Sequence, residues 1–185
     1  MIDVNDLRRG TTFILDGELY KVLEYQHHKP GRGNAIIRTK LRNLRTGATV
    51  QQTFLSGDRV QEVRIERRGV QYLYNDGDLY YFMDTETYDQ VGVPAYLLEG
   101  QTGYLKEGME LVISMYENQP IEVELPTAVD LQVVDTEMAI AGDTATNVMK
   151  KATLETGLEI QVPLFVQAGD TVRVDTRTGE YVTRV

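Results

Sequence analysis

The sequence has no cysteine, no tryptophan and only two histidines among 185 residues. Without cysteine, disulfide scaffolds, thiol nucleophiles and cysteine-ligated metal sites are excluded. His27 and His28 are adjacent, so in a strand they point to opposite faces and cannot bind one metal ion together. No apolar run approaches the roughly 20 residues of a membrane-spanning helix, and the first ten residues lack the apolar core of a signal peptide. We therefore expect a cytoplasmic protein with no membrane contact, no metal and no cofactor.

Acidic residues outnumber basic ones, 28 to 19, which gives a formal net charge of −9. Taken alone, this charge argues against nucleic acid as a partner. Yet residues 1–63 carry +3, residues 64–126 carry −8 and residues 127–185 carry −4. Between residues 21 and 45, seven basic residues stand against Glu24 alone. One basic region on an acidic protein suits a directed contact with phosphates. A solvated strand face is the alternative that charge leaves open.

Apolar and polar residues alternate along several short stretches, which is typical of half-buried strands. In residues 35–42 the basic side chains Arg38, Lys40 and Arg42 share one face. The same alternation occurs in residues 121–125 and 129–133. Helix signals are scarce, and the best is residues 84–90, where Asp84 or Thr85 is a candidate cap. We expect an all-β fold with at most one short helix, at that place.

Glycine marks the turns between these strands, because it supplies the positive φ that hairpin turns need. Such turns are predicted at Thr46-Gly47, Asn75-Asp76-Gly77, Thr156-Gly157 and Thr178-Gly179. Strands at this spacing favour several small barrels over one sandwich. The charge change near residue 64 and Pro126-Thr127 are the predicted seams. The expected domains are residues 1–63 with a projecting basic hairpin loop, residues 64–126, which are acidic, and residues 127–185.

The most informative segment is the loop Lys29-Pro30-Gly31-Arg32-Gly33-Asn34, which separates a strand ending near His28 from one starting at Ala35. Pro30-Gly31 fits a type II turn, with Gly31 in the left-handed region, and Gly33 tolerates positive φ as well. Arg32 then stands at the apex between two glycines. Its planar guanidinium matches phosphate oxygens or base edges. An ordinary exposed hairpin loop is the alternative, since such loops use glycine and proline anyway.

Catalytic constellations are weak by comparison. Asp76/Asp78 and Glu122/Glu124 have the spacing of same-face strand neighbours, but nothing marks either pair as an acid–base dyad. The two serines, Ser56 and Ser114, have no nucleophile-elbow context. A small β-barrel hydrolase using paired carboxylates is thus an outside alternative, a scaffold protein is another, and we expect no enzyme activity.

Six ordered motifs resemble the bacterial translation elongation factor P family, and together they span essentially the whole chain. They are HKPGRGNA at 28–35, KLRNLRTGATV at 40–50, YLYNDG at 72–77, FMDTETYDQ at 82–90, KKATLETGLEIQVPLFVQAG at 150–169 and VDTRTGEYVTRV at 174–185. The resemblance implies three β-barrel domains in tandem, an SH3-like KOW-type domain followed by two OB-type domains, with an elongated, tRNA-like shape.

The resemblance also implies a function. Family members bind the 70S ribosome between the peptidyl-tRNA and exit sites, promote peptide-bond formation and relieve stalling at consecutive prolines. The implied partners are ribosomal RNA and the acceptor end of peptidyl-tRNA, and the chain is expected to be a monomer. Catalysis would stay with ribosomal RNA, while the factor lowers the entropic cost of alignment. An elongation-factor-P-like paralogue with a related role is the near alternative.

Carried over by position, the resemblance makes Arg32 the tip residue, in a loop with Lys29, Pro30, Gly31, Gly33 and Asn34. It implies that Gly142, Asp143, Thr144, Ala145 and Thr146 form the loop that approaches the exit-site codon. Tyr181 and Arg184 match the family ending and are candidate RNA contacts.

Two departures from the family pattern stand out. Many members carry a modified lysine at the tip, and Arg32 cannot accept lysine-type chemistry. Some arginine-tip members are rhamnosylated and others work unmodified. Arg32 is therefore a candidate modification site for a modifying enzyme, with both states open. Residues 147–152 read NVMKKA where members often have GGGKPA, so we expect a stiffer, more basic loop there.

Overall fold

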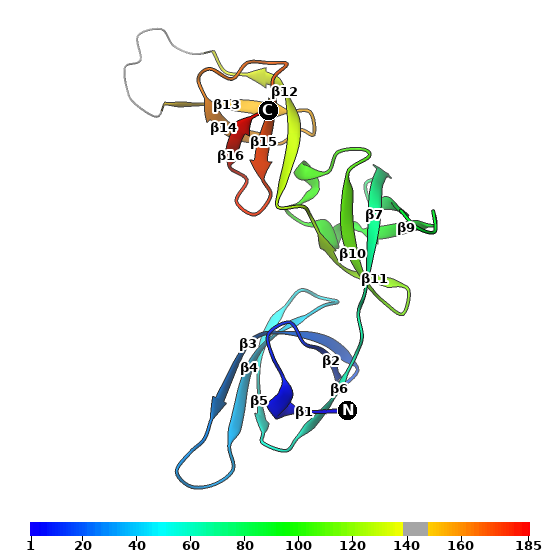
Figure 1. The fold of residues 1–185 in the computed structure, drawn as a ribbon, viewed down its shortest axis with the longest axis vertical. Coiled ribbons are helices and arrows are strands. Elements are labelled where there is room, and N and C mark those ends of the chain that lie inside the picture. Colours follow the sequence, from blue (N-terminus) through cyan, green and yellow to red (C-terminus); the bar gives the residue numbers. More distant parts are fainter. Residues whose placement is uncertain (139–147) are drawn as a thin grey trace. The chain divides into compact units, whose positions relative to one another are not determined.

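The computed structural model describes residues 1–138 and 148–185, which form strands joined by turns (Figure 1). In these residues the chain has sixteen strands in three sheets and three short 3₁₀ segments. The all-β prediction is confirmed. The structure divides into two compact units, residues 1–67 with 114–122 and residues 68–113 with 123–185. Each unit is described separately below.

The first unit holds a six-stranded sheet in the order β1-β6-β2-β3-β4-β5. A 3₁₀ segment, Val4–Asp6, follows its first strand. The strands are β1 (Ile2–Asp3), β2 (Thr12–Leu15), β3 (Glu18–His28), β4 (Ile36–Asn43), β5 (Thr49–Leu55) and β6 (Arg59–Glu62).

The core of this sheet follows directly from the alternation in the sequence. On β4 the side chains of Ile37, Thr39 and Leu41 are buried, whereas Arg38 and Arg42 are exposed. Each apolar side chain buried this way contributes about 1.5–3 kcal/mol, so a one-residue slip of β4 would expose the apolar set and bury arginines. The alternation therefore fixes which face of β4 meets solvent. The remaining members of this core are Val4, Leu7, Phe13, Val22, Phe54 and Val60.

The tip of the hairpin formed by β10 (Glu110–Tyr116) and β11 (Gln119–Glu124), residues 114–122, also belongs to the first unit. There Ile121 packs with Leu19 and Leu44 in a small apolar cluster. Lys21 Nζ lies 3.2 Å from a carboxylate oxygen of Glu122, so this lysine already has a partner within its unit.

Two further sheets have the same topology. The orders β11-β10-β7-β8-β9 and β14-β13-β12-β15-β16 both read 3-2-1-4-5 when strands are numbered within their own sheet. The strands are β7 (Glu66–Asn75), β8 (Leu79–Asp84), β9 (Gln90–Pro94), β10 (Glu110–Tyr116), β11 (Gln119–Glu124), β12 (Ala128–Thr136), β13 (Met149–Leu154), β14 (Glu159–Pro163), β15 (Thr171–Asp175) and β16 (Tyr181–Arg184). Two 3₁₀ segments, η2 (Ala95–Leu98) and η3 (Thr102–Tyr104), lie between β9 and β10.

Segment η3 completes the core of the C-terminal sheet. Tyr104 is only 8% exposed and packs among the buried side chains of β12–β15. A Cβ added to Gly103 would lie 3.0 Å from the Leu158 side chain, so the backbone here approaches as closely as glycine allows. The Thr156 hydroxyl donates a hydrogen bond to the Gly103 carbonyl.

Residues 85–89 form the turn between β8 and β9, so no helix forms at the one place where the sequence allowed a short one. The short 3₁₀ segments lie elsewhere, which the sequence did not predict. The Asp84 carboxylate accepts hydrogen bonds from the backbone N–H groups of Glu86 (2.8 Å) and Thr87 (3.0 Å), and Tyr88 adopts a left-handed φ of 62°. An aspartate can satisfy these N–H groups in a turn as readily as at a helix start. Here β8 and β9 pair on either side, so the turn is favoured.

The glycine turns are confirmed, because Gly47, Gly77, Gly157 and Gly179 all have positive φ. None of the described residues belongs to a helix long and apolar enough to span a membrane.

Candidate nucleic-acid interface

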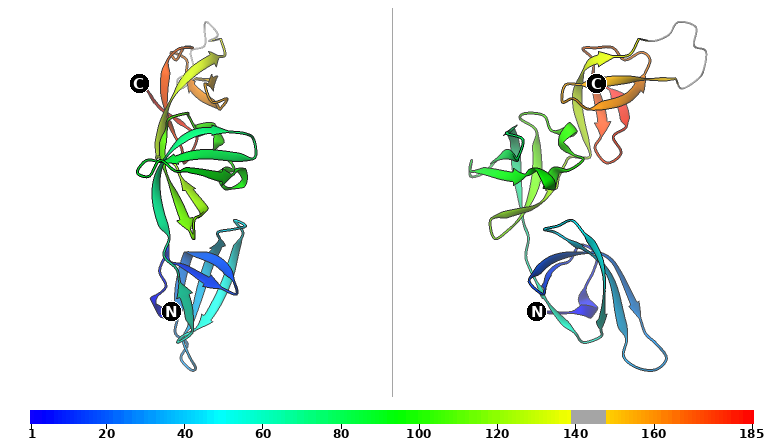
Figure 2. Two further views of the ribbon diagram at one scale, coloured as in Figure 1. Left: turned by 90° about the vertical axis from the view of Figure 1, so that its right-hand side faces the viewer. Right: turned by 180° about the vertical axis from the view of Figure 1, so that it is seen from behind.

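Strands β3 and β4 form the basic hairpin, which ends in the loop of residues 29–35. The two strands pair antiparallel from Tyr20 opposite Asn43 to His28 opposite Ile36. Both views in Figure 2 show this hairpin extending beyond the rest of the six-stranded sheet. The alternation of the two strands and the end of β3 at His28 thus place the loop where the sequence indicated.

Arg32 lies exposed at the tip of this loop. Gly33 has a φ of 92°, whereas the φ of Gly31 is not positive. The prediction that Gly31 takes the left-handed position of a type II turn is therefore wrong, and Gly33 supplies that conformation. A loop of seven residues need not reverse its direction at the Pro30-Gly31 pair. One glycine after the arginine is enough to close it.

The side chains of the loop make no hydrogen bonds or ion pairs with any described residue. Other turns are closed by a side-chain acceptor, and four of them show the contrast. Asn43 accepts from the N–H groups of Arg45 and Thr46, and carboxylates play this part in the others. They belong to Asp76, Asp84 and Asp175. The donors of Arg32 and Lys29 thus keep their full capacity for an external acceptor.

The outward face of β4 continues the positive charge of the loop. Arg38, Lys40 and Arg42 lie in a row opposite polar residues of β5, which are Thr53, Gln51 and Thr49. Lys40 has one distant carboxylate neighbour, Glu24, at 3.9 Å. Neither Arg38 nor Arg42 forms an ion pair within the described residues. Guanidinium groups flanked by hydroxyl and amide donors make a surface suited to phosphate oxygens.

The C-terminal candidates have different surroundings. Arg184 Nη1 lies 3.8 Å from the Asp170 carboxylate, and the guanidinium lies over the Phe165 ring at 5.1 Å. Tyr181 is half-buried, packs against the C-terminal core and lines a cavity. Both residues belong to the second unit, whereas the Arg32 loop belongs to the first. Residues Gly142 to Thr146 lie outside the described residues.

Metal chemistry has no support in the described segments, where no group of three or more histidine, aspartate or glutamate side chains is placed to hold an ion. No acid–base dyad accompanies the Arg32 loop either. The site can bind and orient a polyanion through the guanidinium of Arg32 and the ammonium of Lys29, which are hydrogen-bond donors without an acceptor.

Models of elongation factor P match nearly all of this chain. They are the KOW-like domain at residues 3–60, the OB domain at residues 65–123 and the elongation factor P C-terminal model at residues 129–184. Elongation factor P of Moorella thermoacetica is 53% identical and that of Pelotomaculum thermopropionicum 52% identical, each over the full length of both chains. The chain belongs to the elongation factor P family. Elongation factor P is a translation factor and not an enzyme, so the expectation of no enzyme activity is confirmed.

The KOW-like and OB models also confirm the types predicted for the first two domains. A solved structure titled eukaryotic translation initiation factor 5A from Methanococcus jannaschii is similar, with a TM-score of 0.50 and 25% identity. The similarity covers 66% of this chain and 94% of that one. The exact domain boundaries, after residues 63 and 126, stay predictions.

Sequence reasoning missed the polar row beside the basic residues of β4 and, apart from Tyr181, the residues of the C-terminal cavity. The polar row on β5 consists of Thr49, Gln51 and Thr53. Because Gln52 between them is polar as well, the alternation of polar and apolar residues is hard to see in the sequence. The cavity is lined by Met149, Gln161 and Tyr181, which come from three different strands. A pattern within one stretch of sequence cannot show that these residues lie together.

Proposed function

We propose that this chain binds the ribosome between the peptidyl-tRNA and exit sites and promotes peptide-bond formation where consecutive prolines stall it. One observation carries the proposal: Arg32 stands exposed and without an internal partner at the end of a basic hairpin. A slender cationic tip can enter a crevice lined by RNA that a globular surface cannot enter.

The proposed mechanism is positional. Lys29, Arg38 and Arg42 neutralise phosphates of the acceptor end, while Arg32 donates hydrogen bonds near the reacting end of peptidyl-tRNA. Holding two reactants in a productive geometry can remove several kcal/mol from a barrier without any group that moves protons. Proline is a poor and conformationally restricted partner for peptide transfer, so alignment helps most there.

Three further assignments belong to this proposal. Arg32 is the site for a modifying enzyme, since its exposed guanidinium is accessible from solvent. The segment Gly142 to Thr146 approaches the exit-site codon. Tyr181 and Arg184 contact RNA, and for Arg184 such a contact exchanges the 3.8 Å pair with Asp170 for an external acceptor.

The test is reconstituted translation of a reporter with three consecutive prolines. Four reactions are compared: no factor, unmodified recombinant chain, Arg32→Ala and Arg177→Ala. Arg177 is the matched control, because it is also an exposed arginine at a hairpin turn. We expect the unmodified chain and Arg177→Ala to relieve the stall, and Arg32→Ala to lose most of that relief while its melting temperature is unchanged.

Two outcomes contradict the proposal. If Arg32→Ala relieves the stall as well as the unsubstituted chain does, the tip has no role. If neither the unmodified chain nor chain isolated in modified form binds ribosomes at low salt, the ribosome is not its partner. Activity of the modified chain alone shows instead that Arg32 acts through its modification.

A further inference from the structure

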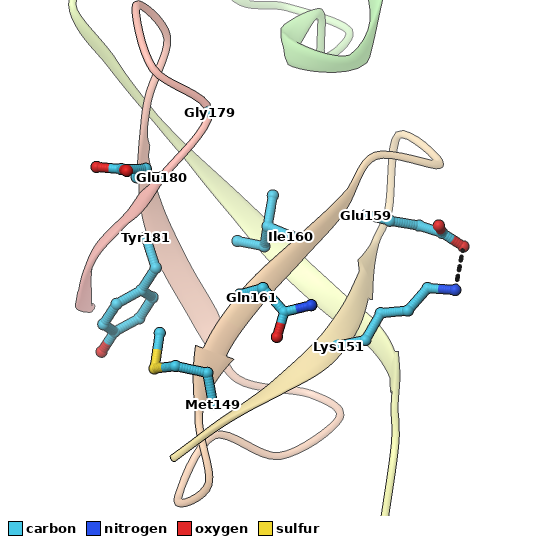
Figure 3. Close-up of a pocket in the computed structure, with 8 residues that line it drawn as sticks. All are labelled: Met149, Lys151, Glu159, Ile160, Gln161, Gly179, Glu180 and Tyr181. Carbon is cyan, nitrogen blue, oxygen red and sulfur yellow. Dashed lines mark ion pairs between the residues drawn. The ribbon is translucent and has the colours of Figure 1, made fainter. Parts of the chain in front are cut away.

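A cavity of about 630 Å³ opens on the C-terminal sheet between β14 and β16. Figure 3 shows the Tyr181 ring and Met149 on one side, Gln161 in the middle and the Lys151–Glu159 ion pair on the other side. The lining also includes Ile160, which is 6% exposed. The volume of the cavity lies within the roughly 300–1,000 Å³ range of small-ligand pockets.

The topology puts this cavity at the ligand face of an OB-type barrel. Numbered within the sheet, β13 and β14 are the second and third strands, and residues 176–180 form the loop between the fourth and fifth. OB-type barrels bind oligonucleotides on this strand pair and on this loop. β14 and β16 end the sheet, so part of their backbone donors and acceptors lacks a strand partner.

The lining suits the face and the edge of a nucleobase. The Tyr181 ring offers a stacking surface, and Met149 and Ile160 keep the surroundings apolar. The Gln161 amide makes no hydrogen bond to any described residue, and it offers both a donor and an acceptor. Stacking of a base on an aromatic side chain contributes about 1–3 kcal/mol. An aromatic surface beside an amide is therefore enough to hold one base.

The same sheet gives little to a phosphate, because its exposed cations are already paired. Lys151 lies 3.2 Å from Glu159, Arg173 2.8 Å from Asp130 and Arg177 3.0 Å from Asp175. Arg184 pairs with Asp170, and Lys150 is buried, with only 7% of its surface exposed. Recognition here would depend on the base and not on the backbone charge.

We propose that this cavity binds a single unpaired RNA base, stacked on Tyr181 with its edge against the Gln161 amide. This inference rests on the proposed function, because it assumes that RNA is the partner. It adds a second mode of contact: the basic hairpin binds phosphates, and the C-terminal cavity binds a base.

The experiment measures fluorescence anisotropy of labelled single-stranded RNA pentanucleotides, one for each base, with the full chain. The chain carries Arg32→Ala, Arg38→Ala and Arg42→Ala so that the basic hairpin contributes less to phosphate binding. An abasic pentanucleotide with the same phosphates is the matched ligand control. We expect binding of at least one base type, loss of binding to the abasic strand, and affinity that changes less than about twofold between 50 and 200 mM salt.

Three variants test the residues. Tyr181→Phe keeps the stacking ring and should bind normally, whereas Tyr181→Leu should weaken binding about fivefold or more. Because Tyr181 also packs against the core, Leu substitution could unfold the sheet, so Gln161→Ala provides a second test on an exposed side chain. It should change the preference among the four bases.

Equal affinity for the abasic strand, or unchanged binding by both Tyr181→Leu and Gln161→Ala, overturns the inference. The proposed function fails separately, through the proline reporter. A chain that relieves stalling but does not bind any pentanucleotide keeps its function and loses this cavity as an RNA site.

Discussion

Arg32 and Arg177 are both exposed arginines at hairpin turns, yet they are held in opposite ways. Arg177 donates from its backbone N–H (2.8 Å) and from its guanidinium (3.0 Å) to the carboxylate of Asp175, two residues earlier. Arg32 has Pro30 at the corresponding position and no acceptor among the described residues. One turn binds its own cation, and the other leaves its cation free.

The difference extends to the sheets that carry the two turns. On β4 both arginines lack an ion pair within the described residues, while on the C-terminal sheet Arg173, Arg177 and Arg184 are all paired. A cation already paired must break that contact before it binds a phosphate, but a free one only releases solvent and counterions. The net charge of −9 is therefore a poor guide to whether this chain binds phosphates. What matters more is whether each cation is already paired.

The strongest test of this contrast removes two cations from each region. Arg38→Ala with Arg42→Ala should weaken ribosome binding about tenfold and reduce the slope of log affinity against log salt by about two. Arg173→Ala with Arg177→Ala should change the affinity by less than about twofold. Filter binding over a salt titration measures both. Equal slopes for the two double variants would contradict the contrast.

A smaller effect is expected when Arg32 is given a carboxylate of its own. Pro30→Asp puts an acceptor two residues before Arg32, as Asp175 stands before Arg177. An exposed ion pair contributes about 0.2–1 kcal/mol, so relief of the proline stall should fall about 1.4- to fivefold, read from the rate of full-length reporter synthesis. Pro30→Asn is the control, because it adds the turn acceptor without the charge.

Full activity of Pro30→Asp would show that the freedom of Arg32 is irrelevant. An equal loss in Pro30→Asn would assign the effect to the missing proline ring.

The smallest effect concerns pH. The guanidinium of Arg177, and next its backbone N–H, hold the pKa of Asp175 below the ordinary value of 3.8. Above that ordinary value the carboxylate is ionised in both states and its stabilisation is complete. As pH falls below it, the unfolded chain takes up the proton first, so this stabilisation is lost through the lowered pKa. Thermal unfolding from pH 5 to pH 2.5 should therefore show a shallower decline for Asp175→Asn than for the unsubstituted chain.

Asp76, Asp84 and Asp130 also have lowered pKa values, so Asp175→Asn should flatten the decline only in part. Identical pH profiles would mean that Asp175 makes no pH-linked contribution.

Local patterns were enough to predict the strands and the position of the basic loop. Burial of Ile37, Thr39 and Leu41 needs only a period of two, and the glycines and proline around Arg32 are turn residues in any fold. The conformation inside the loop depends on how all seven residues close, which is why Gly33 and not Gly31 takes the positive φ. The turn at Asp84 was missed because its hydrogen bonds are compatible with a helix start, and strand pairing decides between them.

The C-terminal cavity could not be predicted for a different reason. Met149, Gln161 and Tyr181 come from three strands of one sheet, and their meeting depends on how that sheet curves. In the sequence Met149 and Gln161 are unremarkable strand residues, and Tyr181 stands out only through the resemblance of the chain's ending to the family. The availability of cations was equally hidden, since ion pairs such as Arg173 with Asp130 join residues far apart in the chain.

The placement of Tyr104 has a consequence for how the chain folds. Its ring completes the core of β12–β15, and a Cβ at Gly179 would lie 3.0 Å from its hydroxyl oxygen. Residues 127–185 alone would present an uncovered apolar end, because the side chain that covers it is contributed by an earlier segment. During synthesis, residues 68–126 emerge first with Tyr104 unburied. The last two sheets should therefore unfold as one cooperative block, and a fragment cut between them should be prone to aggregation.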